Sequence, residues 1–154
     1  MPEALERSQR IALPPDEAFD FFGDARNLER ITPPWLRFRV VTPDPVQMGR
    51  GTLIRYRLRL HGVPVNWLTE IAEWKPGVRF RDRQVSGPYA LWDHTHTFEP
   101  DGNGGTVIGD RVVYEIPFGP LGAAAKTLFV RRDVERIFDF RAEEITVDGL
   151  NGAG

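Results

Sequence analysis

Residues 52–74 read TLIRYRLRLHGVPVNWLTEIAEW, and this stretch decides the fold. From residue 54 to residue 60, apolar side chains alternate with arginines, and a second alternating run follows His61-Gly62. A period of two is typical of a strand with one buried face, and a short link that contains glycine is typical of a hairpin. The sequence therefore predicts two antiparallel strands that share one apolar face and one charged face.

The same period extends over most of the chain. Residues 7–13 predict a first strand, and later alternating runs, separated by turn residues such as Lys75-Pro76-Gly77, predict strands at 36–42, 52–60, 63–74, 78–86, 90–99 and 106–115. Connections this short join neighbouring antiparallel strands. We therefore expect one antiparallel sheet of about seven strands.

Helical patterns flank this sheet. Pro14-Pro15-Asp16-Glu17 is typical of a helix start, and the apolar residues up to Ile31 predict one or two short helices that end at residues 32–34. After Phe118-Gly119-Pro120-Leu121, a long C-terminal helix is predicted by apolar-face spacing at Val130, Val134, Ile137, Phe138, Arg141 and Ile145. A second group lies on a different side of an ideal helix, which predicts a kink or a separate short helix near residue 129: Leu121, Ala125, Leu128 and Phe129.

The alternation assigns the two faces of the sheet. The outer face takes half of the arginines together with acidic residues that can pair with them, among them Glu70, Asp93, Glu99 and Glu115. The inner face is apolar and aromatic, and the long C-terminal helix is the element available to cover it. The predicted fold class is therefore α+β, a helix-grip fold with a curved antiparallel sheet around a long C-terminal helix and two short helices after the first strand.

Polar residues interrupt the apolar inner face: Asp82, Gln84, His94, His96 and Asp110. A dry core tolerates such groups only when each has hydrogen-bond partners, whereas a cavity with one polar end accommodates them. We therefore expect a small-molecule cavity between the sheet and the helix. The expected ligand contacts are Tyr56, Trp67, Phe80, Asp82, Gln84, Trp92, His94, His96, Asp110 and Tyr114.

His94 and His96 leave the same face of one strand, which leaves three uses open. They could share a metal with Asp82 and Asp110, hydrogen-bond to those aspartates as a structural or ligand-orienting network, or act in general acid–base catalysis. The candidate catalytic residues are His94, His96 and Asp110. The spacing of two is a weak metal signal, so we expect no metal and no cofactor.

Composition narrows the function classes further. A net charge of −2 gives no global reason for nucleic-acid binding, and the absence of cysteine excludes disulfides and thiolate catalysis. The arginine-rich outer face is an alternative surface for RNA, but it lacks interleaved aromatic residues. We expect a single cytoplasmic domain over residues 1–148 with a flexible tail at 149–154, no nucleic-acid partner, no membrane insertion and a small hydrophobic ligand. A homodimer is compatible with the sequence.

The chain resembles the START-like, or Bet v 1-like, superfamily, and in detail its bacterial SRPBCC members of the polyketide cyclase/dehydrase-like type. The resemblance covers about residues 5–146 and is carried by four stretches: Asn27-Leu28-Glu29-Arg30-Ile31-Thr32-Pro33, Thr69-Glu70-Ile71-Ala72-Glu73-Trp74, Gly87-Pro88-Tyr89 with Trp92 and His94-Thr95-His96-Thr97-Phe98, and Pro117-Phe118-Gly119-Pro120-Leu121-Gly122. It implies the helix-grip fold and binding of a lipid- or polyketide-like molecule by carriage or sequestration. A cyclase or dehydratase acting in the same cavity is the alternative that the resemblance implies.

Overall fold

The computed structural model describes residues 2–117 and 123–147, with side chains for 2–117 and 129–145. The predicted helix start at 118–121 and the predicted flexible tail at 149–154 lie outside the described residues. Along the chain the elements are β1 (Glu3–Ile11), α1 (Pro15–Phe22), α2 (Asn27–Arg30), η1 (Pro34–Leu36), β2 (Arg39–Val40), β3 (Leu53–Leu60), β4 (Val63–Lys75), β5 (Arg79–Ser86), β6 (Leu91–Pro100), β7 (Thr106–Glu115) and α3 (Ala123–Val147).

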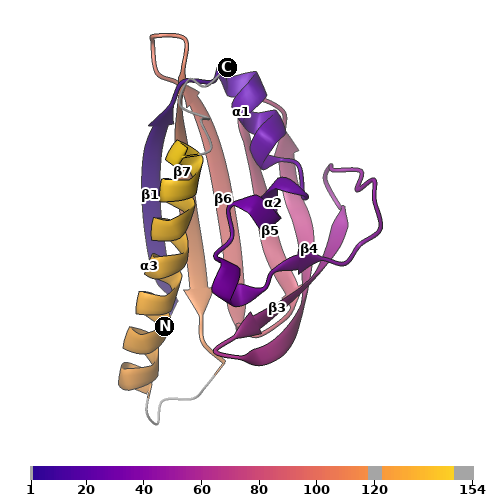
Figure 1. The fold of residues 1–154 in the computed structure, drawn as a ribbon, viewed down its shortest axis with the longest axis vertical. Helices are drawn as coiled ribbons and strands as arrows, with labels where there is room; N and C mark the ends of the chain where they lie inside the picture. The colour runs from indigo at the N-terminus through magenta and orange to yellow at the C-terminus, as the bar shows by residue number, and fades with distance from the viewer. Residues whose placement is uncertain (1, 118–122, 148–154) are drawn as a thin grey trace.

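The strands form one seven-stranded antiparallel sheet in the order β1-β7-β6-β5-β4-β3-β2. The sheet curves, and α1, α2 and α3 all lie on the same side of it (Figure 1). Helix α3 runs along β1 and β7, whereas the short helices lie over the middle strands (Figure 1). This is the helix-grip arrangement predicted from the sequence.

Two strand predictions had wrong limits. The strand expected at 36–42 is reduced to Arg39–Val40, because Arg37 has a left-handed backbone (φ 46°) and its N–H bonds to the carbonyl of Pro34, which closes the η1 turn. The strand expected at 7–13 begins at Glu3 instead and ends at Ile11. Its earlier start follows from continuous pairing with β7, from Glu3 opposite Tyr114 to Ile11 opposite Thr106.

The hairpin between β3 and β4 has a two-residue turn, His61-Gly62. Both residues have positive φ (50° and 80°), which is the turn geometry that matches the twist of paired strands. The turn brings His61 against α3, where its Nε2 lies 3.3 Å from an Asp133 carboxylate oxygen and its ring centroid lies 4.8 Å from that of Phe129. The separate short helix expected before residue 129 was wrong, because α3 runs unbroken from Ala123 to Val147. The alternative of a kink stays a prediction, and Phe129 is exposed beside the hairpin tip.

A bulge in β4 determines which side chains reach the core. The pairing with β5 shifts between Ile71 and Glu73, so that Glu73 lies opposite Arg81 and Trp74 lies opposite Phe80. Trp74 therefore points inward, where it packs edge-on against Phe19 of α1. These contacts hold α1 against the middle strands of the sheet.

Helix α3 covers the sheet with the face that the sequence predicted. Val134, Phe138, Arg141 and Ile145 are buried, and none of the described helices is long and apolar enough to cross a membrane. On the opposite face of the sheet, cross-strand ion pairs join arginines to acidic residues, as predicted for Glu70 and Asp93: Arg79–Glu73, Arg81–Asp93 and Arg83–Glu70. Exposed pairs of this kind add little stability, so the core interactions carry the fold.

The buried position of Ile11 on β1 predicts a large loss of stability when its side chain is shortened. Ile11 is 2% exposed and packs against the short helices, so Ile11→Ala should lower the free energy of unfolding by about 2–5 kcal/mol through lost contacts and an added cavity. Leu53→Ala, at a position 51% exposed on β3, is the control and should change it by less than about 0.5 kcal/mol. Urea unfolding measures both, and equal losses would contradict this view of the core.

Candidate ligand-binding cavity

A cavity of about 140 Å³ lies between the inner face of the sheet and the helices. A cavity of similar size, about 150 Å³, binds benzene in another protein, so this space suits about one ring. Its wall is mainly apolar and comes from α1, the α2–η1 region, the strands β3 to β6, and α3. The lining residues include Phe22, Leu36, Phe38, Met48, Ile54, Leu58, Thr69, Ile71, Tyr89, Ile137 and Arg141.

The structure brings together most of the ligand contacts that the sequence predicted. The expected residues that line the cavity are Tyr56, Trp67, Phe80, Asp82, Trp92, His94 and His96. They come from four adjacent strands, and the alternation of inward side chains along each strand places them on one concave surface. Whether they touch a ligand stays a prediction.

Gln84, Asp110 and Tyr114 do not line this cavity. The amide of Gln84 donates to the carbonyl of Tyr89 and accepts from its N–H, so it holds the turn between β5 and β6. Asp110 lies beyond His94 and borders a separate hollow between β1 and α3. Tyr114 is buried in the cluster where β7 meets α3.

Arg141 is the functional candidate that the sequence reasoning missed. Its position in the apolar spacing of α3 was recognised, but its charge was not connected to the polar groups on the sheet. The signal was present, because an arginine on the buried face of a helix needs an anionic partner and the inner face of the sheet offers Asp82 and Asp110. Tyr89 and Thr69 also line the cavity, and no sequence pattern marked them as site residues.

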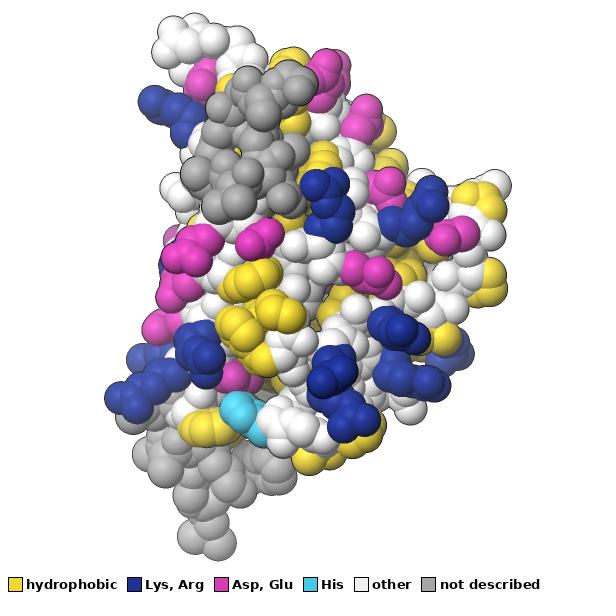
Figure 2. Space-filling model, in the orientation of Figure 1, with side chains coloured by type: hydrophobic (Ala, Val, Ile, Leu, Met, Phe, Trp, Pro, Cys, Tyr) yellow, Lys and Arg dark blue, Asp and Glu magenta, His cyan; other side chains and the backbone are white. Residues whose placement is uncertain are grey.

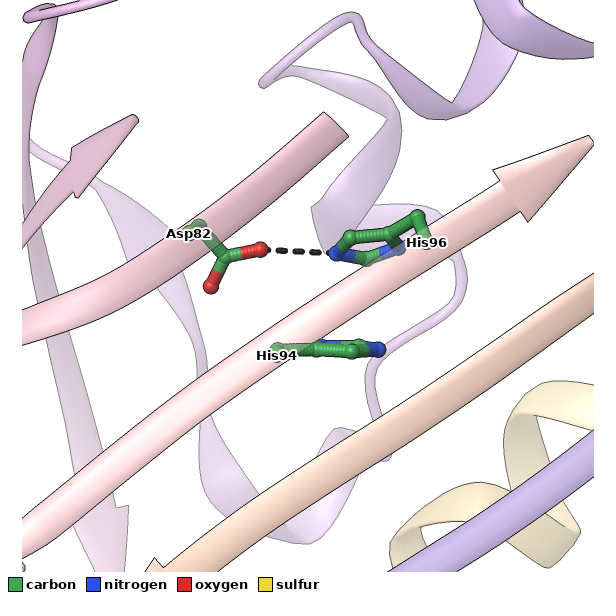
Figure 3. A group of neighbouring side chains, drawn as sticks. All are labelled: Asp82, His94 and His96. Atoms are coloured by element: carbon green, nitrogen blue, oxygen red, sulfur yellow. Dashed lines mark hydrogen bonds and ion pairs between the residues drawn. The ribbon is translucent and has the colours of Figure 1, made fainter. Parts of the chain in front are cut away.

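The polar end of the cavity is built around two stacked imidazoles. The rings of His94 and His96 lie 3.7 Å apart, one above the other (Figure 3). Each ring bonds to a carboxylate on a different flanking strand: His96 Nε2 lies 2.7 Å from Asp82 on β5, and His94 Nε2 lies 2.7 Å from Asp110 on β7. The hydrogen bonds to aspartate that the sequence offered as one alternative are therefore present.

Helix α3 supplies the cation that faces this cluster. Arg141 is 8% exposed, and its Nη2 lies 3.3 Å from the Asp110 oxygen that also contacts His94. The guanidinium lies over the rings of Phe22 and Phe138, at 5.3 and 5.7 Å from their centroids. Such cation–π contacts partly replace the water that a buried guanidinium loses.

Burial and pairing set the charges of these groups. Burial by itself would raise the pKa of Asp110, but Arg141 and the hydrogen bond with His94 outweigh it and hold that pKa well below its usual range. Burial would also raise the pKa of Asp82, and the hydrogen bond with His96 reverses the effect, so the net shift is downward. Burial, reinforced by His94, lowers the pKa of His96 to about 4 despite Asp82. Both carboxylates are therefore ionised and His96 is neutral at pH 7.

The phenols of Tyr56, which is buried, and Tyr89, which is partly buried, also border the cavity. Burial raises the pKa of Tyr56 far above its usual value, and the nearby charge of Asp82 adds to this. Burial likewise raises the pKa of Tyr89. Both side chains therefore remain protonated and can donate hydrogen bonds.

Asp82, His94 and His96 offer the one grouping of possible metal ligands found among the described residues, with ligand atoms within 4.8 Å of one another. The geometry does not favour a shared ion. Each Nε2 atom bonds to a carboxylate on a different side of β6, so an ion shared by the two histidines would have to use their Nδ1 atoms. Asp82 lies on the Nε2 side of His96 and could not join that set, and His96 Nδ1 faces an Asp110 oxygen at 3.5 Å. The arrangement fits a hydrogen-bonded network better than a metal centre.

The chain belongs to the family described as polyketide cyclase / dehydrase and lipid transport, whose model matches residues 3–146. The family resemblance stated from the sequence is therefore confirmed. No curated protein matches the sequence.

Solved structures share the fold at low sequence identity. Zhui aromatase/cyclase from Streptomyces sp. R1128 has 15% identity and a TM-score of 0.77, over 100% of this chain and 99% of that one. TTHA0849 from Thermus thermophilus has 23% identity and a TM-score of 0.66, over 95% and 99%. Ara h 8.0201 has 16% identity and a TM-score of 0.64, over 96% and 99%. These likenesses show the Bet v 1-like fold and leave the ligand open.

The lowered pKa of His96 predicts a specific loss of stability in acid. Between pH 6.5 and about 4 the unfolded chain binds a proton on this histidine and the folded chain does not, so the free energy of unfolding falls as pH falls through this window. The expected loss from His96 is about 3 kcal/mol. The aspartates, with lowered pKa values, contribute stability that is lost only at lower pH.

His96→Gln keeps a donor for Asp82 and should flatten the pH dependence between 6.5 and 4, as measured by urea unfolding at each pH. The control is His61→Gln, at the half-exposed hairpin tip, which should retain the slope. An unchanged slope in His96→Gln would show that this imidazole is not kept neutral by burial.

Proposed function

We propose that this protein binds a small hydrophobic or amphipathic molecule, such as a lipid or a polyketide, in the cavity and thereby carries or sequesters it. The observation that supports this most is the cavity itself, which has an apolar wall and one end built from ionised and hydrogen-bonding groups. Ligand sites combine these two features, because apolar walls supply affinity and a few polar groups orient the ligand.

The size of the cavity bounds the ligand. At about 140 Å³ the cavity takes a ring system or the end of a longer molecule. A longer ligand would have to extend between the elements that border the cavity. Figure 2 shows hydrophobic side chains gathered on the surface between α3 and the η1 segment, where Trp35 packs edge-on against Phe140.

Aromatic truncation tests the proposal. Trp92→Leu removes an indole from the cavity wall and should weaken binding of a small neutral apolar probe such as naphthalene about tenfold, since an aromatic wall residue contributes about 1–2 kcal/mol. Trp35→Leu, at a position 45% exposed on the outer surface, is the matched control and should bind like the wild type. Fluorescence titration measures both, and equal affinities in the two variants would place the probe outside the cavity.

The His94–Asp110 pair favours a second candidate, a cyclase or dehydratase acting on a polyketide-like substrate. When His94 Nε2–H donates to Asp110, its Nδ1 keeps a lone pair, and the carboxylate supports the imidazolium that forms when Nδ1 takes a proton. A CH₂ group between two carbonyls is acidic enough to lose that proton. The name of the Zhui aromatase/cyclase supports this candidate by analogy of fold.

Proton exchange distinguishes the enzyme from a carrier. With 1-phenylbutane-1,3-dione as probe, an enzyme should accelerate exchange of the central CH₂ protons with deuterated solvent, as followed by NMR. His94→Gln should slow this exchange at least about a hundredfold without weakening probe binding. Exchange at the buffer rate in a protein that binds the probe would contradict the catalytic candidate and leave the carrier.

A further inference from the structure

Three buried side-chain polar atoms in the described part of the chain lack a hydrogen-bond partner: Trp67 Nε1, His96 Nδ1 and Arg141 Nε. Leaving a buried polar group unpaired costs about 1–3 kcal/mol, so such atoms are uncommon in folded proteins. All three belong to residues that line the cavity. For the two donors, Trp67 Nε1 and Arg141 Nε, this shared location indicates that a ligand supplies the missing acceptors.

Two of these atoms specify what the partner must be. The indole N–H of Trp67 and the guanidinium N–H of Arg141 can only donate, so each needs an acceptor. His96 Nδ1 differs, because the neutral imidazole already donates from Nε2 to the ionised Asp82, so Nδ1 keeps a lone pair and lies 3.5 Å from an Asp110 oxygen. It therefore adds no acceptor requirement to the ligand. The ligand therefore carries at least two acceptor atoms, for which oxygen is the usual element.

The two donors belong to opposite ends of the cavity. The ring of Trp67 packs edge-on against Trp92, at 5.3 Å between centroids. His96 lies four residues beyond Trp92 along β6, about 13 Å along the strand, and its partner across the β6–β7 pairing is Asp110, which Arg141 contacts. The two donors are therefore separated along the sheet, and a ligand that bonds to both carries its oxygens at opposite ends of an apolar body.

The charges around the polar end select against an anion. The facing groups are Asp82 on β5, the two histidines on β6, Asp110 on β7 and Arg141 on α3, with the protonated phenol of Tyr56 on β3. Two carboxylates face one guanidinium, so one negative charge is left over when both imidazoles are neutral. Protonation of one imidazole would only bring the sum to zero. A ligand carboxylate would add an unpaired negative charge in either case, and burial makes that costly.

We propose that the cavity selects a neutral molecule with acceptor oxygens at both ends, such as a diketone or quinone-like compound, over carboxylic acids of the same size. Arg141 receives one oxygen and Trp67 receives the other. This specificity rests on the proposed function, because it presumes that the cavity binds a ligand.

Four probes of matched size test the inference by isothermal titration calorimetry at pH 7.5: 1,4-diacetylbenzene, 4-ethylacetophenone, 4-acetylbenzoate and 1,4-diethylbenzene. The diketone should bind about fivefold tighter than the monoketone, since one hydrogen bond contributes about 1 kcal/mol. It should bind at least about tenfold tighter than the carboxylate, because the unpaired charge costs more than a hydrogen bond gains.

Substitutions of Trp67 and Arg141 test which side chain binds each oxygen of the diketone. Trp67→Phe keeps a ring but loses the donor, and it should remove the advantage of the diketone over the monoketone. Arg141→Lys keeps the positive charge beside Asp110 but replaces the planar guanidinium donor. Arg141→Met removes both the charge and the donor. Each variant should reduce the affinity for the diketone more than the affinity for diethylbenzene. Arg136→Met is the control, because Arg136 lies over Trp35, which does not line the cavity, and it should leave the whole ranking unchanged.

The outcomes separate the inference from the proposed function. Equal binding of the diketone and diethylbenzene, or tighter binding of 4-acetylbenzoate, would overturn the inference and leave ligand binding intact. Failure of all four probes to bind would contradict the proposed function itself, and the inference with it.

Discussion

The contact between Asp110 and Arg141 ties the sheet to the helix that covers it. A carboxylate on the inner face of β7 also accepts a hydrogen bond from His94, and the guanidinium that faces it comes from α3. Removing either charge would leave the other buried without a partner, which typically costs about 3–5 kcal/mol. The position of the helix and the polarity of the cavity therefore depend on the same pair.

Around this pair, the inner face of the sheet divides into a packed part and an open part. Towards α1, the rings of Phe19, Trp74 and Phe98 interlock as a core. Towards the β3–β4 hairpin, Trp67 and Trp92 form a wall that is not filled from the helix side. The hydrogen-bonded histidines lie between the two regions, so the polar groups mark the boundary where close packing gives way to space.

Much of the fold could be predicted because one physical rule governs it. Alternation of apolar and charged residues identified the strands from 52 to 115 within a residue or two, and helical spacing identified the buried face of α3. The ends of the sheet were less predictable. The left-handed turn at Arg37 and the bulge before Glu73 depend on tertiary packing, and neither has a local sequence signal that alternation detects.

Site residues could be predicted where their position depends only on which face of a strand they occupy. They could not be predicted where their role depends on a contact between residues that are far apart in the sequence. Alternation placed Asp82, His94 and His96 on the inner face, and they line the cavity. The same rule could not show that Gln84 reaches back to Tyr89, because that depends on the path of the turn. Nor could it pair Arg141 with Asp110, since those residues meet only when the helix closes over the sheet.

The most direct test of the central claim is the electron density in a crystal structure of the protein as purified. Extra density between Trp67 and Arg141, or ordered water in hydrogen-bond contact with both, would show that the sheet and helix hold open a site whose donors await a partner. Side chains that meet across this space and satisfy one another would contradict the account.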